Sequence, residues 1–126
     1  MTIERRKYVR FLAKDNSFAA LRNGFKKVGK IDDISINGLG FSFLSEITEV
    51  DTAGHFSEVD IFLSGNGFHL SNVPCRIVYE ALDSTTDEGF LVRMSRCGLQ
   101  FWELTGSQLE QLELFIENYT TGISDA

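Results

Sequence analysis

Apolar and polar positions alternate with a period of two through most of residues 18–103. Leu39, Phe41 and Phe43 alternate with small residues and predict a half-buried strand. Asn-Gly and Gly-Asn-Gly turns separate such stretches, which predicts a small antiparallel barrel without exposed edges. Strands are expected at residues 18–23, 25–34, 39–43, 59–63, 68–70, 75–80, 90–95 and 97–103.

One predicted strand carries a proline and a mixed set of large side chains. We expect Pro74 to mark the start of this strand or a bulge, because proline donates no ladder hydrogen bond. Alternation then predicts that Cys75, Ile77 and Tyr79 share one face. Arg76 and its alternating neighbours should occupy the opposite face.

The period changes to that of a helix after residue 104. Apolar residues such as Leu112 and Phe115 recur at helical spacing, and Ser107 with Glu110 forms a capping-box pattern. We expect an amphipathic helix over residues 105–120 that covers the open side of the barrel. Docking of a partner on the helix is the alternative.

The chain length of 126 residues fits one domain. Its parts are expected to be a mobile basic arm (1–17), the barrel (18–104) and the helix (105–120), with Gly122 ending the helix and a frayed end from Ser124. No run reaches the roughly 18 apolar residues of a membrane span. Two cysteines without metal-ligand spacing, and no secretory signal, predict reduced thiols in a cytoplasmic protein.

The net charge of -6 conceals an asymmetry along the chain. Residues 1–30 carry nine Lys or Arg against Glu4 and Asp15, a net +7, so the rest of the chain carries -13. A basic arm on an acidic body predicts binding of a small anion and repulsion of long nucleic acids. An ordinary solvated basic face is the alternative interpretation.

Patterns typical of catalysis are missing from the sequence. His55 and His69 lack metal-ligand spacing, and the chain has neither a G-x-S-x-G elbow nor a G-x-x-x-x-G-K phosphate loop. We therefore expect no enzyme, no metal site and no cofactor.

Two polar motifs point instead to binding. Arg6 and Arg10 form R-x-x-x-R, while Asp33, Ser35 and Gly38 form D-x-S-x-x-G. Guanidinium groups bind phosphate, or O6 and N7 of guanine, in a bidentate manner. A carboxylate can accept from the N1 and N2 protons of guanine, which adenine lacks, so the pair predicts a guanine-nucleotide site.

The corner of the second motif has its own expected geometry. Ser35 can bond a base or a phosphate. Gly38 permits a positive φ or a close backbone approach, and Asn37 before it tolerates the left-handed region. Taken alone, each motif also fits a purely structural role.

The order and separation of these motifs resemble a known family. E-R-R-K-Y-V-R, D-D-I-S-I-N-G-L-G-F, C-R-I-V-Y and C-G-L-Q-F-W-E-L, followed by an amphipathic helix, look like a PilZ domain from Arg5 to about Tyr119. The resemblance implies a six-stranded antiparallel β-barrel with one C-terminal α-helix that binds the bacterial second messenger cyclic di-GMP. The contacts it implies fall on Arg5, Arg6, Arg10, Asp33, Ser35 and Gly38, with Arg96 and Gly98 as further candidates.

The resemblance also implies a stand-alone receptor. Cyclic di-GMP would draw the basic arm across the barrel face and change the surface shown to a protein partner in motility, secretion, exopolysaccharide or regulatory machinery. A PilZ-fold interaction adaptor with little or no nucleotide binding is one alternative. A single-strand nucleic-acid binder is another, although it would need a broad basic groove.

Overall fold

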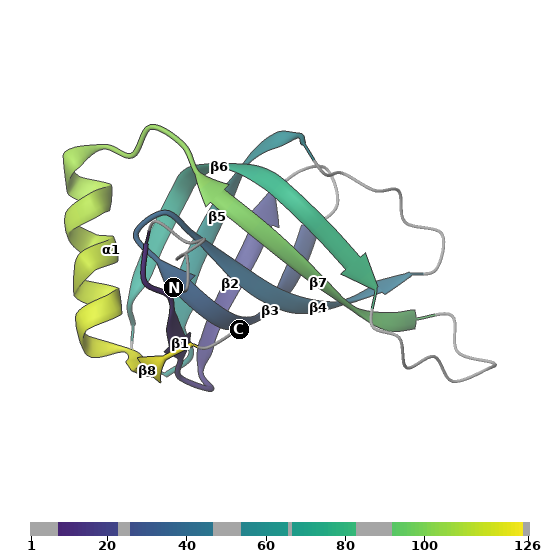
Figure 1. Ribbon diagram of the computed structural model, residues 1–126, viewed down its shortest axis with the longest axis horizontal. Helices are drawn as coiled ribbons and strands as arrows, with labels where there is room; N and C mark the ends of the chain where they lie inside the picture. The colour runs from purple at the N-terminus through teal and green to yellow at the C-terminus, as the bar shows by residue number, and fades with distance from the viewer. Residues whose placement is uncertain (1–7, 23–25, 47–53, 66, 83–91, 125–126) are drawn as a thin grey trace, which may run out of the picture.

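The computed structural model describes residues 8–22, 26–46, 54–65, 67–82 and 92–124. Within these ranges the chain forms strands joined by antiparallel pairing, and one helix near its C-terminal end (Figure 1). The elements are β1 (Phe11–Ala13), β2 (Ser17–Arg22), β3 (Lys26–Ser35), β4 (Gly38–Glu46), β5 (Phe56–Leu63), β6 (His69–Leu82), β7 (Val92–Phe101), α1 (Gly106–Asn118) and β8 (Thr120–Ile123). The predicted turns at residues 23–24 and 66 lie outside the described ranges.

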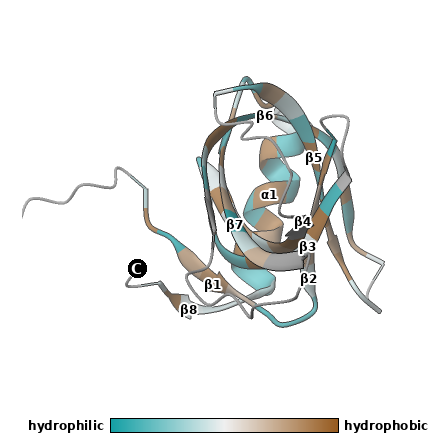
Figure 2. Cartoon of the chain, turned by 90° about the vertical axis from the view of Figure 1, so that its right-hand side faces the viewer, coloured by the Kyte–Doolittle hydropathy of each residue, from teal (hydrophilic) through white to brown (hydrophobic). Residues whose placement is uncertain are grey.

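Six strands close into a barrel. Their order is β2-β5-β6-β7-β4-β3, and the pairing of β2 with β3 completes the ring. The predicted six-stranded antiparallel barrel with one C-terminal helix is confirmed. The short strands β1 and β8 extend the sheet from β3, and in Figure 2 they lie outside the ring.

Alternation places the apolar side chains inside the barrel. Leu39, Phe41 and Phe43 on β4 are buried, as are Val59 and Ile61 on β5. The predicted inward faces of these two strands are therefore correct. The packed interior is what gives the outer face of β3, β4, β7 and β6 a fixed shape.

Helix α1 crosses one end of the barrel, as the view along the ring in Figure 2 shows. Leu112 and Phe115 are fully buried and join the barrel core. The expected capping box at residues 107 and 110 is wrong. Thr105 is the N-cap, because its Oγ1 accepts from the Gln108 N–H (3.0 Å) while Gln108 Oε1 accepts from the Thr105 N–H (3.0 Å).

The helix also ends earlier than expected. Tyr119 is its C-cap, so Gly122 does not terminate it and instead lies in β8. Ser124, expected to be frayed, is buried and donates its backbone N–H to the carbonyl of Arg10 (2.9 Å). None of the helices in the described ranges is long and apolar enough to cross a membrane.

Strands β6 and β7 are each longer than the sequence indicated. Residues 68–70 and 75–80 were expected as two strands, but β6 runs through Pro74. The expected strands 90–95 and 97–103 are likewise joined in β7. The Pro74 carbonyl accepts from Trp102 N (2.9 Å), just beyond the end of β7. In an antiparallel strand the N–H and C=O of one residue point toward the same neighbouring strand. The N–H that Pro74 lacks would therefore point toward Trp102, beyond the end of β7, and no hydrogen bond within the β6–β7 pair is lost.

In the described residues, three bulges lie in the barrel strands, and a further register shift lies between β1 and β8. The extra residue lies on β3 between Ile31 and Asp33, on β6 between residues 77 and 79, and on β6 between Leu70 and Val73, where β6 pairs with Ile61 and Val59 of β5. Each extra residue reverses the faces of those that follow. Tyr79 therefore turns outward and is 45% exposed, so its expected placement with Cys75 and Ile77 is wrong.

Candidate functional site

The arginine motif and the D-x-S-x-x-G motif meet at one ion pair. Arg10 Nη1 donates to Asp33 Oδ1 at 3.0 Å. The arginine side chain keeps 24% of its surface exposed and the aspartate side chain 9%. The carboxylate is thus shielded on one side by a guanidinium that solvent can still reach.

Strands β1 and β8 hold Arg10 in this position. Strand β1 begins at the next residue and pairs with β3, with Leu12 opposite Asp33. On its other side β1 pairs with β8, and the backbone N–H of Ser124 reaches the Arg10 carbonyl. Arg10 lies within the segment expected as an arm, and its backbone is anchored by the C-terminal strand.

Ser35 and Gly38 form the hairpin corner between β3 and β4. The Ser35 hydroxyl accepts from the Asn37 N–H (3.0 Å) and lies 3.5 Å from the Gly38 carbonyl. Asn37 does not adopt a positive φ, so the corner does not use the left-handed region. A Cβ on Gly38 would lie 2.0 Å from the Leu99 carbonyl oxygen, which means that close approach of β7 requires the glycine.

Beside the ion pair, two glycines add no side chain to the outer face, and the Tyr79 ring covers one of them, Gly98. Gly40 is opposite Asp33 on one side and opposite Gly98 on the other. A Cβ on Gly40 would lie 3.0 Å from Asp33 Oδ1, 3.8 Å from the Tyr79 hydroxyl and 3.9 Å from Arg96 Nη2. These polar groups therefore surround a floor that has no side chain of its own.

A second aspartate–arginine contact borders the same floor. Asp32 is the extra residue of the β3 bulge, and its Oδ2 accepts from the Ser42 hydroxyl (2.6 Å). The same oxygen lies 3.5 Å from Arg96 Nε. Two guanidinium groups, each beside its own carboxylate, thus flank the outer face around Gly40.

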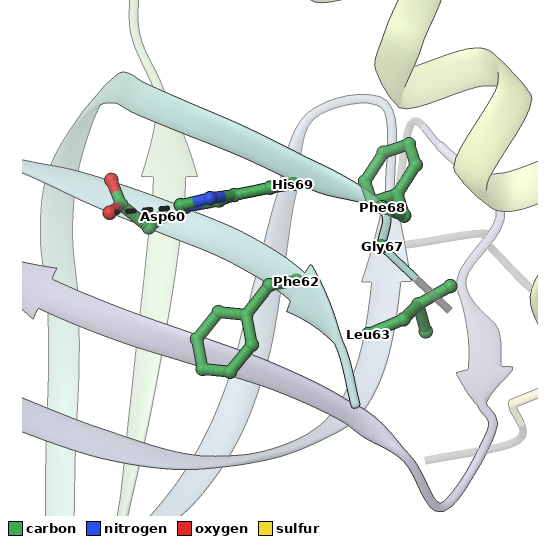
Figure 3. Close-up of a pocket in the computed structure, with 6 residues that line it drawn as sticks. All are labelled: Asp60, Phe62, Leu63, Gly67, Phe68 and His69. Atoms are coloured by element: carbon green, nitrogen blue, oxygen red, sulfur yellow. Dashed lines mark ion pairs between the residues drawn. The ribbon is translucent and has the colours of Figure 1, made fainter. Parts of the chain in front are cut away.

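A different polar cluster lies on β5 and β6. Asp60 Oδ2 accepts from Arg22 Nη2 (2.7 Å), and its Oδ1 accepts from the Asn72 N–H (2.9 Å). His69 Nε2 lies 3.5 Å from Oδ2. A pocket of about 390 Å³ adjoins the cluster, and Figure 3 shows its lining of Asp60, Phe62, Leu63, Gly67, Phe68 and His69. No residue of this lining belongs to either sequence motif.

The Asp60 cluster lacks the geometry of a catalytic relay. His69 Nε2 faces both Asp60 and the Ser71 hydroxyl (3.3 Å), whereas a relay places its acid and its nucleophile on different ring nitrogens. Among the described residues no group of three or more His, Cys, Asp or Glu is placed to hold a metal ion. Burial raises the pKa of Cys75 and of Cys97 to about 12, so both thiols stay protonated at neutral pH.

Comparison with known families decides how the outer face is interpreted. The PilZ domain model matches residues 4–118. The chain belongs to the PilZ family. Comparison with curated proteins finds no match.

Solved PilZ structures share the fold. The PilZ domain with c-di-GMP of YcgR from Escherichia coli aligns with a TM-score of 0.73 and 15% identity over 92% of both chains. The K. pneumonia MrkH–c-di-GMP complex gives 0.69 and 13%, covering 93% of this chain and 53% of that one. Bacillus subtilis inhibitor of motility (MotI/DgrA) gives 0.59 and 14%, covering 91% and 51%. This PilZ chain therefore spans about half the length of the MrkH and MotI chains.

The described residues of the PilZ motifs lie at one corner of the barrel. Arg10 and Asp33 are in contact, and Ser35 and Gly38 shape the adjoining corner. The further candidates Arg96 and Gly98 lie on the same outer face. Arg5 and Arg6 lie outside the described residues.

Sequence reasoning missed three residues of this face. Asp32, Gly40 and Tyr79 were not among the predicted contacts, although the quoted segments D-D-I-S, G-L-G-F and C-R-I-V-Y contain them. The adjacent acids Asp32 and Asp33 were the available signal of a bulge. In a regular strand two neighbouring side chains face opposite sides, so one of the two carboxylates would point into the core. The bulge lets each of them reach a different arginine.

Proposed function

We propose that this PilZ domain is a cyclic di-GMP receptor without catalytic activity. The ligand binds between the arginine motif and the barrel corner and signals through a protein partner. The observation that carries the proposal is the contact between Arg10 and Asp33, which puts a phosphate-binding and a guanine-binding group side by side. The proposed contacts are Arg5, Arg6, Arg10, Asp33, Ser35 and Gly38.

Binding would replace the ion pair with ligand contacts. The Arg10 guanidinium turns to a phosphate, or to O6 and N7 of guanine, while the Asp33 carboxylate accepts from N1 and N2 of the base. Arg5 and Arg6 add charge as their segment closes over the dinucleotide. The partner then meets a changed surface.

An apolar row on the same outer face suits a protein contact. Val28, Leu44 and Met94 are 50%, 69% and 42% exposed and stand on the neighbouring strands β3, β4 and β7. This row also favours the second candidate function, a PilZ-fold interaction adaptor with little or no nucleotide binding. Titration with cyclic di-GMP separates the two.

Isothermal titration of cyclic di-GMP into the wild-type protein and matched arginine variants tests the receptor. Arg10→Ala should weaken binding by about tenfold or more, because a charge-assisted bond is lost. Arg22→Ala removes an arginine–aspartate pair outside the proposed site and should leave affinity unchanged. Wild-type affinity in both Arg10→Ala and Asp33→Ala would overturn the site, and absence of binding by the wild type would favour the adaptor.

A further inference from the structure

Two aromatic side chains lie against each other on the outside of the barrel wall. Phe56, at the start of β5, and Trp102, just after β7, meet edge to face, with ring centroids 5.5 Å apart and ring planes at 73°. They are 62% and 43% exposed. An edge-to-face contact occupies one face of one ring, so the remaining faces stay open. An exposed aromatic pair of this kind is typical of a surface that contacts another protein.

The pairing of three strands brings these two rings together. Phe56 is opposite Arg76 of β6, and Trp102 donates its backbone N–H to the carbonyl of Pro74 on the same strand (2.9 Å). Residues 74 and 76 alternate with buried residues of β6 and therefore share its outer face. The rings meet across β6, at the end of the wall where the chain passes from β7 into α1 (Figure 1).

Two acidic side chains flank the Trp102 side of the aromatic pair. Glu58 on β5 is opposite Pro74, and Glu103 directly follows Trp102; both are exposed. Glu103 has a φ of 53°, in the left-handed region that glycine adopts at less cost. A charged side chain is thus kept where glycine would suit the backbone better, which supports a role for the Glu103 carboxylate.

The acidic character continues along the chain into the helix. From residue 97 to residue 126 the sequence contains no Lys or Arg, and its acidic residues are Glu103, Glu110, Glu113, Glu117 and Asp125. The three on α1 are exposed. The helix begins beside β6, since Gln108 Nε2 donates to the Asn72 carbonyl (3.2 Å). Arg76, a basic group, lies on the Phe56 side of the pair, so a cation is favoured at the Trp102 side.

An arginine side chain matches this arrangement. Cations bind over the faces of aromatic rings, best over tryptophan, and the planar guanidinium also stacks on such rings. The carboxylates of Glu58 and Glu103 complement its charge. We propose that the Phe56–Trp102 pair is a docking site for an arginine-containing basic segment of a partner protein. The proposal does not depend on binding of cyclic di-GMP.

Trp102 is the only tryptophan of the chain, so its fluorescence reports on this surface. A capped synthetic peptide of alternating arginine and alanine is titrated into the protein at about 0.15 M salt, which screens attraction between distant charges. A saturable change in Trp102 emission is expected. The same peptide with glutamine in place of arginine should cause none. Absence of a saturable change with the arginine peptide would overturn the proposal.

Two uncharged substitutions show whether the aromatic pair itself is required. Phe56→Ser keeps every charge and the Trp102 reporter, and should bind the arginine peptide about fivefold more weakly or worse. Ile123→Ser removes a similarly exposed side chain (65%) from β8, which pairs with β1, and should bind like the wild type. Thermal unfolding confirms that both variants fold. Equal affinity of folded Phe56→Ser and wild type would overturn the proposal, because binding would then follow from net charge alone.

Charge variants test the orientation without altering the rings. Glu58→Gln should weaken binding of the arginine peptide, whereas Arg76→Gln should strengthen it; unchanged affinity in both, or the reverse order, would contradict the proposal. Sedimentation of the wild type alone should show no association that depends on Phe56. Association that is lost in Phe56→Ser would assign the aromatic pair to a second copy of the chain and overturn the proposal.

Discussion

Two aspartates beside β-bulges each pair with an arginine, yet their surroundings differ. The carboxylate oxygens of Asp60 are contacted by the Arg22 guanidinium, the Asn72 N–H and the His69 ring. Among the described residues the Asp33 carboxylate has Arg10 as its one partner, and it borders the bare surface of Gly40. A carboxylate whose acceptor sites are filled serves the fold, whereas one beside an open floor can exchange its partner for a ligand.

The largest expected effect is a loss of affinity for cyclic di-GMP on substitution of Asp33, which substitution of Asp60 should not cause. Asp33→Asn should weaken cyclic di-GMP binding by about tenfold or more, because an amide NH₂ meets the N1 and N2 donors of guanine. Stability should fall less than in Asp60→Asn, since the described contact of the Asp33 carboxylate is one ion pair, whereas Asp60 also accepts from a backbone N–H. Calorimetry together with urea unfolding checks both. Undiminished affinity in this variant would remove Asp33 from the site.

Asp60→Asn should give the opposite result. The unfolding free energy at neutral pH should fall by about 1–3 kcal/mol, because the buried carboxylate holds hydrogen bonds to a charged group and to a backbone N–H. Urea unfolding measures the loss, and binding of cyclic di-GMP should be unchanged. A stable Asp60→Asn variant with impaired binding would reverse the roles assigned to the two clusters.

Acid should reduce the difference in unfolding free energy between the wild type and Asp60→Asn. Burial alone would raise its pKa, but the Asn72 N–H and the Arg22 guanidinium outweigh burial and hold the pKa below the usual 3.8. A lowered folded-state pKa contributes stability that is present above 3.8 and lost as pH falls through the folded value. The difference in unfolding free energy between wild type and Asp60→Asn should therefore narrow as the pH of the measurement is lowered from 3.8 through the folded-state pKa. A gap of constant size at all pH values would contradict this electrostatic account.

The smallest expected effect concerns the corner next to Asp33. Ser35→Ala removes the acceptor of the Asn37 N–H and should lower the unfolding free energy by about 1 kcal/mol. If Ser35 also contacts the ligand, calorimetry should show a further loss of affinity in the folded variant. Unchanged stability would mean that the hydroxyl does not hold the turn.

The sequence predicted the parts of the fold that follow a simple period. Alternation at Leu39, Phe41 and Phe43 reflects burial on one face of a strand, and the spacing of Leu112 and Phe115 reflects burial on one face of a helix. The two motifs identified Arg10 and Asp33, which the structure brings into contact. Local patterns suffice where each residue keeps the face that its position dictates.

What the sequence missed depends on non-local pairing. The bulge that turns Tyr79 outward is set by its register with Gly98, and nothing in the local alternation shows it. The strand after the helix forms because β1 is available to pair with it, which also anchors Arg10 through Ser124. Such features follow from neighbours distant in the chain.

The central claim is that cyclic di-GMP binds at the Arg10–Asp33 face and not at the Asp60 cluster. Backbone amide chemical shifts recorded by NMR while cyclic di-GMP is added to the wild-type protein test it most directly. The account predicts saturable shifts around Arg10, Asp33, Gly40 and Gly98, with signals around Asp60 unchanged. Shifts centred on Asp60, or none anywhere, would contradict it.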